Sequence, residues 1–235
     1  MNAPPARSSL ALRRIPLFEG LGDACLDRLA QQCDWHQLPA RQPLLSRAAE
    51  GGDVFFLVAG RLRITTYSAS GRQVTFRDCE PGEHIGVIAA IDGGPRSADV
   101  VTLDATLVAS LSRDGFLALL RDEPLVAQRV MHYLASLVRQ LSDRVIDLST
   151  LGVHNRLHAE LLRLARAAGV QGNQARIEPA PAHAELASQI STNREQVTRE
   201  LGVLVKAGVL QKDGRALVVV DAARLERMVA EVRGE

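Results

Sequence analysis

The chain has 235 residues, of which 46% are hydrophobic, and its formal net charge is +1. This composition predicts a globular protein of one or two domains with a sizeable core, and the near-neutral charge excludes nucleic-acid binding that rests on bulk charge alone. The sequence has no run of 18 apolar residues and its start lacks the apolar block of a signal peptide, so we expect a cytoplasmic protein without a membrane partner.

Cysteines and histidines are too scattered to predict a metal site or a disulfide framework. The chain has three cysteines, Cys25, Cys33 and Cys79. They lack the fourth thiolate and the close spacing of an iron–sulfur site, so we interpret them as structural thiols. His154 and His158 have the i, i+4 spacing of helical metal ligands, but Asn155 replaces the glutamate of the metalloprotease motif. We therefore expect an exposed helix face there and no metal.

Residues 1–14 contain Pro4, Pro5, Ser8 and Ser9 and are predicted to form a loose arm. A helix is predicted over residues 23–32. Asp23 is a suitable N-cap for this helix because its carboxylate can accept from the first backbone N–H groups. The expected buried stripe is Leu26, Leu29 and Ala30.

Between Trp35 and Leu111 the hydrophobic period changes from helical to two. Val54–Val58 is a near-continuous apolar run, as in a buried strand, and 61–67 and 72–78 alternate. The residues of the alternating strands that we expect to point inward are Leu62, Ile64, Val74 and Phe76. Many short strands separated by turn signals predict a sandwich or a jelly-roll β-barrel.

A long helix follows the strands. Ser112 is expected to cap a short helix that ends at Leu120, and Pro124 opens a second one that runs to about Thr150. Apolar residues recur along it at near-heptad spacing, at Val130, Leu134, Leu137, Leu141, Val145 and Leu148. The polar residues between them, Arg144 included, are expected to face water. We interpret the helix as a homodimer seam; the alternative is that it packs wholly within its own chain.

The stretch from Pro181 to Leu210 predicts two helices joined by a tight turn. The first helix would bury an apolar stripe, made by Ala184, Leu186, Ala187 and Ile190. Thr192 followed by Glu195 fits a capping box, which starts the second helix. The expected buried face of the second helix is Val197, Leu201, Leu204 and Val205. This arrangement is typical of a helix-turn-helix, whose second helix enters the DNA major groove.

The outer face of the second helix carries Arg194, Glu195, Thr198 and Arg199. Arginine matches the two acceptors of guanine, and a carboxylate can accept from the amino group of cytosine, so these side chains could read a short G/C-containing sequence. The alternative is a solvated face with local ion pairs.

Two short strands directly after this helix, at 209–210 and 216–220, predict a hairpin and hence a winged helix-turn-helix. Lys212 and Arg215 would lie at the wing tip, where contact with a DNA phosphate is plausible. The fold class is therefore α+β, with three expected parts: a sensor barrel over 1–122, a dimerisation helix over 123–151 and a winged helix-turn-helix over 152–235.

Together these parts resemble the CRP/FNR family of bacterial transcription regulators over almost the whole chain. The segment Ile15–Leu21 is similar to that family's N-terminal start, and Gly82–Val100 is similar to its phosphate-binding cassette. Arg194–Arg199 resembles the recognition helix of the cyclic-AMP receptor branch. The resemblance implies a homodimer that binds double-stranded DNA at a palindromic operator with TGTGA-type half-sites and contacts RNA polymerase.

The resemblance also assigns site residues. Arg194, Glu195 and Arg199 correspond to the base-reading residues, and Asn193 and Thr198 are further candidates for DNA binding. His183 stands where the family often has a phosphate-contacting arginine.

In the cassette, Arg96 and Ser97 correspond to the residues that hold a cyclic phosphate. Gly86 is followed by Val87 where cyclic-AMP binders have a glutamate for the ribose, and Leu141–Ser142 replaces their threonine–serine pair. Valine cannot accept a hydrogen bond, which would cost about 1–3 kcal/mol at a buried hydroxyl. The effector is therefore left open between cyclic AMP, a cyclic dinucleotide, another ligand and none.

Three alternatives to a ligand-switched regulator remain from the sequence. The barrel could be only a dimerisation scaffold, the chain could be a nucleotide-binding subunit that acts on a protein partner, or His36 or His84 could ligate a haem in a gas- or redox-sensing regulator. An enzyme is not expected, because the sequence has no Walker loop, no Gly-x-Ser-x-Gly elbow and no metal-ligand set, and we assign no catalytic residue.

Overall fold

The computed structural model describes residues 8–68 and 73–233 and divides the chain into two compact units, residues 1–137 and 138–235. The first seven residues of the expected arm lie outside the described part. The long helix α5 (Pro124–Thr150) has the bounds that the sequence predicted and begins in the first unit and ends in the second.

The N-terminal segment is not a loose arm from residue 9 onward. It forms the short helix α1 (Ser9–Leu12) and a turn of 3₁₀ helix (Pro16–Phe18), because Leu12 and Phe18 are buried in the core of the first unit. Helix α2 (Asp23–Gln32) has the predicted bounds and buried stripe, but its N-cap is Gly22. Asp23 is instead the first helical residue, and its carboxylate accepts from Arg13 at 2.5 Å.

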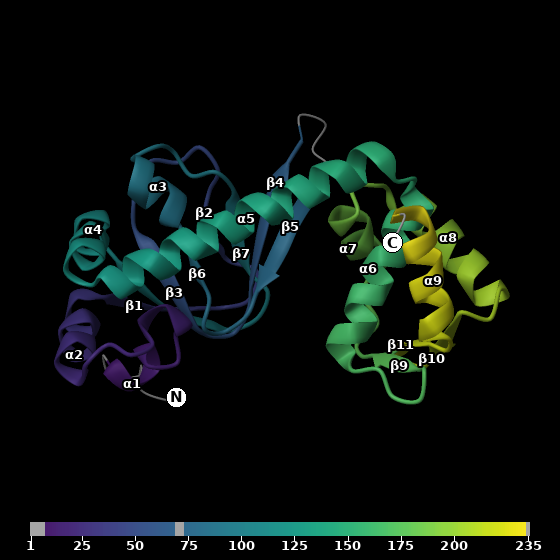
Figure 1. The fold of residues 1–235 in the computed structure, drawn as a ribbon, viewed down its shortest axis with the longest axis horizontal. Coiled ribbons are helices and arrows are strands. Elements are labelled where there is room, and N and C mark those ends of the chain that lie inside the picture. Colours follow the sequence, from purple (N-terminus) through teal and green to yellow (C-terminus); the bar gives the residue numbers. More distant parts are fainter. Residues whose placement is uncertain (1–7, 69–72, 234–235) are drawn as a thin grey trace. The chain divides into compact units, whose positions relative to one another are not determined.

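The β-rich part of the first unit consists of two four-stranded antiparallel sheets, as predicted for a sandwich or barrel (Figure 1). The strands that form the sheet of order β1-β8-β3-β6 are β1 (Asp34–Leu38), β8 (Thr106–Leu111), β3 (Val54–Ala59) and β6 (His84–Ile85). The strands of the second sheet, of order β2-β7-β4-β5, are β2 (Pro43–Leu45), β7 (Asp99–Thr102), β4 (Leu62–Tyr67) and β5 (Gln73–Cys79).

The inward residues predicted for β5 are wrong, and this strand contains a β-bulge. Thr65 pairs with Thr75 while the neighbouring Ile64 pairs with Arg77, so Phe76 is the extra residue. Thr75 and Cys79 are fully buried because they pair with the buried residues Thr65 and Leu62 of β4, whereas Phe76 is exposed. Val74 is only half-buried. On β4 the prediction holds, with Leu62 buried and Ile64 packed against the same core.

Two hydrophobic cores stabilise the first unit. One joins the two sheets and includes Leu57, Leu62, Cys79, Ile85, Val100 and Val108. The other lies between the first sheet and the helices, which include α3 (Val87–Asp92) and α4 (Arg113–Asp122). Ser112 caps α4 as predicted, since its hydroxyl accepts from the Gly115 N–H at 3.2 Å. Val126 and Val130 tie α5 into this second core.

The second unit contains the end of α5, four further helices and a three-stranded sheet. The helices are α6 (Val153–Ala168), α7 (His183–Gln189), α8 (Arg194–Lys206) and α9 (Ala222–Arg233). The sheet, of order β10-β11-β9, is formed by β10 (Leu210–Asp213), β11 (Ala216–Val219) and β9 (Ala175–Ile177). Helix α9 packs against α6 (Figure 1). The β10–β11 hairpin directly after α8 is the predicted wing.

Three details of the helix-turn-helix differ from the prediction. Ala184 is exposed and Ser188 takes its place in the buried stripe of α7. Val205 is 37% exposed because it lies on the outer side of the last turn of α8. The N-cap of α8 is Asn193, whose side chain accepts from the Gln196 N–H at 2.8 Å, so the capping box of Thr192 and Glu195 is wrong.

Candidate DNA interface and ligand pocket

The outer face of α8 carries the polar residues that the sequence placed there. Arg194, Glu195, Thr198 and Arg199 are exposed, while Val197 and Leu201 on the opposite side are buried. The Arg199 side chain is 68% exposed, and its Nε lies 3.6 Å from a carboxylate oxygen of Glu200. An arginine with so weak a partner can reorient toward a base edge with little loss of internal bonding.

The residues just before α8 form its cap. The Asn193 side chain holds the Gln196 N–H, and the Thr192 hydroxyl donates to the Gln196 side-chain oxygen at 3.0 Å. Asn193 was predicted at the DNA interface. The hydrogen bond that its side chain accepts from the Gln196 N–H orients the first turn of α8, from which the base-reading side chains project.

The α7–α8 turn rests on two arginines that the sequence did not single out. Arg144 of α5 donates to the Gln189 carbonyl at 2.9 Å, so the prediction that it faces water is wrong. Arg156 of α6 donates to the Ile190 carbonyl at 3.0 Å and to the Leu151 carbonyl at 2.7 Å. Burial lowers the pKa of Arg144. These bonds fix the turn relative to α6 and to the end of α5.

The wing tip has the basic residues predicted for it. Lys212 and Arg215 are exposed on either side of the turn at Gly214, whose φ of +57° suits glycine. Between them, Asp213 forms an ion pair with Arg176 of β9, and Arg176 also binds Glu178 at 3.0 Å. Because Asp213 is paired, its charge opposes a phosphate at the tip less strongly.

His154 and His158 do not form the exposed face that was predicted. His158 is buried, with its Nδ1 unpartnered among the described residues, and the two rings lie 6.0 Å apart. Burial, followed by the charge of His154, lowers the pKa of His158. Within the described ranges, no group of three His, Cys, Asp or Glu side chains is arranged to hold a metal.

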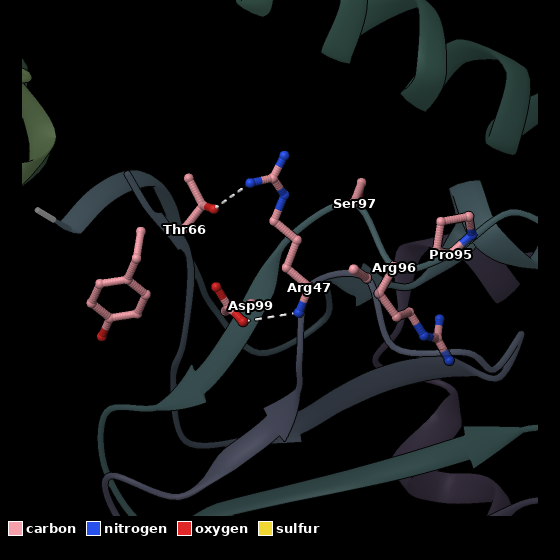
Figure 2. Close-up of a pocket in the computed structure, with 8 residues that line it drawn as sticks. Arg47, Thr66, Pro95, Arg96, Ser97 and Asp99 are labelled. Carbon is pink, nitrogen blue, oxygen red and sulfur yellow. Dashed lines mark hydrogen bonds between the residues drawn. The ribbon is translucent and has the colours of Figure 1, made fainter. Parts of the chain in front are cut away.

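An open pocket of about 650 Å³ lies at one edge of the second sheet of the first unit. Its lining residues are Arg47, Ala48, Thr66, Tyr67, Pro95, Arg96, Ser97 and Asp99. Arg47 donates from its backbone N–H to Asp99 at 2.9 Å and from its guanidinium to the Thr66 hydroxyl at 3.4 Å (Figure 2). Sequence reasoning missed Arg47, because only the fold brings the end of β2 beside β4 and β7.

Arg96 lines this pocket, but its guanidinium turns into the protein, away from Arg47 (Figure 2). It is 6% exposed, donates to the Asp53 carbonyl at 2.9 Å, and lies 5.9 Å from the centre of the Phe55 ring. Burial lowers its pKa, and the nearby charge of Asp53 opposes this effect. The Arg96 guanidinium, which was predicted to bind a phosphate, therefore donates to a backbone carbonyl in this structure, whereas Ser97 is exposed.

Gly86 and Val87 have structural roles beside the pocket. A Cβ atom at Gly86 would lie 2.6 Å from the Asp53 carbonyl oxygen and 2.7 Å from Arg96, so only glycine leaves room for the arginine. Val87 is 2% exposed and belongs to the core between the sheet and the helices. Where a ribose-binding glutamate would stand, this chain has a core residue.

The last two predicted ligand residues lie on the part of α5 that belongs to the second unit. Leu141 is 43% exposed, and the Ser142 hydroxyl donates to the Val138 carbonyl of its own helix at 3.0 Å.

A polar cluster connects β5 and β6 to α5 inside the first unit. Arg77 forms an ion pair with Glu83 and donates to the Tyr133 hydroxyl at 3.3 Å. The His84 ring packs on Tyr133 with a centroid distance of 4.5 Å. Burial, followed by the charge of Arg77, lowers the pKa of His84 to about 4. Its Nε2 is buried and unpartnered among the described residues.

The cysteines are free thiols in the structure. Burial raises the pKa of Cys33 and of Cys79 to about 12, so both are protonated and unreactive at neutral pH, in keeping with structural thiols. Of the helices in the described ranges, none combines the length and the apolar character needed to cross a membrane.

Both parts of the chain match known families. Residues 35–123 match the cyclic nucleotide-binding domain family, and residues 155–228 match the Crp-like helix-turn-helix domain family. These two segments contain the pocket and the helix-turn-helix with its wing.

Curated relatives match nearly end to end. The chain is 30% identical over 213 residues to the cyclic AMP receptor protein of Thermus thermophilus, covering 91% of this chain and 96% of that one. It is 24% identical over 217 residues to the CRP-like cAMP-activated global transcriptional regulator of Mycobacterium tuberculosis, covering 92% and 97%.

Among solved structures, the c-di-GMP-responsive global regulator CLP of Xanthomonas campestris matches with a TM-score of 0.74 and 18% identity, covering 84% of this chain and 99% of that one. At this identity the match supports the fold alone.

Proposed function

The chain belongs to the CRP/FNR family of transcription regulators, and we propose that it acts as a homodimer on a palindromic operator with TGTGA-type half-sites. The observation that carries this proposal is the exposed face of α8, where Arg194, Glu195 and Arg199 project from a helix that follows a tight turn. Arginine can bind guanine O6 and N7 together, and glutamate can accept from cytosine N4.

The exposed apolar face of α5 supports the dimer. Several large hydrophobic side chains are exposed along this one helix: Met131 (61%), Val138 (63%), Leu141 (43%), Val145 (62%), Ile146 (57%) and Leu148 (40%). Such a contiguous apolar stripe on a soluble helix is typical of an interface, and its near-heptad spacing suits a second copy of the same helix. In a two-fold dimer, the two recognition helices would enter major grooves about 34–36 Å apart.

We propose the first unit as a sensor for a cyclic nucleotide or cyclic dinucleotide. Relatives include a cyclic AMP receptor protein, and the matching segment 35–123 is a cyclic nucleotide-binding domain. Arg47 and Ser97 lie exposed at the pocket, and both can bind a phosphodiester. The effector would switch the protein only by binding the DNA-competent arrangement better than the other.

A second candidate is a regulator whose barrel needs no ligand. The inward position of Arg96 favours it, because carbonyl oxygens already occupy the group that would hold a phosphate. Under either candidate we propose a cytoplasmic protein that contacts RNA polymerase and has no catalytic role.

The test is fluorescence anisotropy with a labelled palindromic TGTGA-type duplex and a scrambled duplex of equal composition. Each titration is run at one fixed salt concentration, without nucleotide, with cyclic AMP and with cyclic di-GMP. Tighter binding to the palindrome supports the DNA assignment, and equal affinity for both duplexes refutes it. If one nucleotide tightens binding to the palindrome, it identifies the class of effector. If neither nucleotide changes the affinity, the result favours a barrel that does not respond to these two ligands.

A further inference from the structure

His183, the first residue of α7, is hydrogen-bonded to the DNA-facing side of α8. Its Nδ1 lies 2.7 Å from the Thr198 hydroxyl oxygen. That hydroxyl in turn donates to the Arg194 carbonyl at 2.9 Å. The imidazole therefore lies within one hydrogen bond of the face that carries the base-reading residues.

This arrangement favours one of the two tautomers of a neutral His183. A hydroxyl has one hydrogen, and Thr198 donates it to the Arg194 carbonyl. With that bond formed, the Thr198 oxygen accepts from His183, which favours the tautomer with the proton on Nδ1. In this tautomer Nε2 is a bare acceptor, which cannot bind a phosphate oxygen and repels it.

The charged groups that act on His183 are cations. Arg194 of α8 and Lys212 of β10 both disfavour a second positive charge on the ring. Burial is the larger influence, and together these effects lower the pKa of His183 below its ordinary value. His183 is consequently neutral at pH 7 in the protein alone.

We propose that DNA binding is coupled to the uptake of one proton at His183 of each bound subunit. The inference rests on the proposed DNA-binding function. A DNA phosphate beside His183 offsets the repulsion of the ring by Lys212 and Arg194 and adds a net attraction for its charged form. A proton from solvent then adds to Nε2, and the new N–H donates to a phosphate oxygen while Nδ1 keeps its bond to Thr198.

The sign of the pH dependence follows from this uptake. The DNA complex has the higher pKa at His183, so affinity is greatest at low pH and falls as pH rises through the pKa of the complex. Because the pKa of His183 in the unbound protein lies below 6.5, the fall in affinity begins below pH 6.5 and continues up to the pKa of the complex.

The experiment measures Kd for the palindromic duplex from about pH 6 to 8 at constant ionic strength, and proton uptake at pH 7 by calorimetry in buffers of different ionisation enthalpy. We expect affinity to fall by at least about fivefold across this range, with measurable proton uptake. His183→Arg, which is always charged, should bind with little pH dependence and no uptake. His183→Gln should also lose the dependence.

Thr198→Val gives a second test that keeps the histidine. Without the hydroxyl acceptor, the neutral ring can carry its proton on Nε2 and bind a phosphate directly, so the pH dependence should shrink. Specific binding with the same pH dependence in wild type and His183→Gln overturns the proton uptake but leaves the DNA assignment intact. Absence of specific binding at every pH overturns the proposed function itself.

Discussion

Single residues of α8 carry the proposed sequence reading, and Arg199 gives the most direct test. Its side chain is largely exposed and its contact to Glu200 is long, so its loss should leave the fold intact. We expect Arg199→Ala to cost roughly 1–3 kcal/mol of binding free energy per half-site and to relax the preference for guanine, because a bidentate contact is lost. Anisotropy titrations with the palindrome and with single-base variants measure both effects.

Arg227→Ala is the matched control, since Arg227 is an exposed arginine of α9, outside the reading face. It should leave the discrimination between duplexes unchanged. If Arg199→Ala weakens binding to palindromic and scrambled DNA by the same factor, Arg199 contacts phosphate and not a base.

His84 should make the first unit sensitive to acid. Its pKa in the folded chain is lowered to about 4, whereas the unfolded chain titrates near 6.5. The unfolded state therefore binds more protons between these values, and the free energy of unfolding falls as pH drops below about 6.5. We expect His84 to account for a loss of about 1–2 kcal/mol between pH 6.5 and pH 5.

Urea unfolding monitored by tryptophan fluorescence measures this loss, because Trp35, the only tryptophan in the sequence, packs against a core of the first unit. His84→Phe keeps a ring against Tyr133 but cannot be protonated, so its stability should depend less on pH. If the free energy of unfolding of this variant depends on pH as in the wild type, a group other than His84 causes the acid sensitivity.

At the scale of elements, α8 depends on its cap. Asn193→Ala removes the acceptor for the Gln196 N–H and should lower the free energy of unfolding of the second unit by about 1 kcal/mol. Asn193→Ser keeps an acceptor oxygen and should restore most of the loss. Thermal unfolding followed by far-ultraviolet circular dichroism compares the three proteins, and equal stability of all three would show that the cap contributes nothing.

The sequence predicted elements with a strong period and missed those set by distant pairing. The bounds of α5 were predicted because its apolar spacing and Pro124 are local signals. The bulge at Phe76 has no local signal, because it depends on how β5 pairs with β4. Strand β9 was missed for the same reason: its three residues lie in a Gly- and Pro-rich stretch, and pairing with β11 defines them.

The candidate sites divide in the same way. The reading face of α8 follows from helical periodicity, so Arg194 and Arg199 could be placed from the sequence. The inward turn of Arg96 and the position of Arg47 depend on contacts between segments far apart in the chain. The family resemblance implies a phosphate-binding role for Arg96 but does not predict its conformation, in which the guanidinium is bound to the carbonyls of Asp53 and Gly86.

At the scale of the whole molecule, the proposed homodimer would make α5 essential for tight operator binding. Val138 and Val145 lie one heptad apart on its exposed apolar face. We expect the double variant Val138→Glu and Val145→Glu to be monomeric, because burying four carboxylates at the two-fold seam is costly. Sedimentation equilibrium measures the mass, and the anisotropy assay should show a large loss of affinity for the palindrome.

Asp143→Lys is the control, since Asp143 is exposed on the same helix in a different direction from the apolar residues. It should remain dimeric. A wild-type protein that sediments as a monomer at micromolar concentration, or a double variant that stays dimeric, would contradict the proposed seam.

The two arginines that bind carbonyls of the α7–α8 turn affect the interpretation of a salt titration of DNA binding. Arg144 and Arg156 bind uncharged backbone oxygens at half-buried positions, where dissolved ions screen little. Added salt should therefore leave the position of the recognition helix unchanged and should lower the affinity only through the release of cations from DNA. The slope of log affinity against log salt, about −0.9 for each neutralised phosphate, then counts the phosphates that the protein contacts.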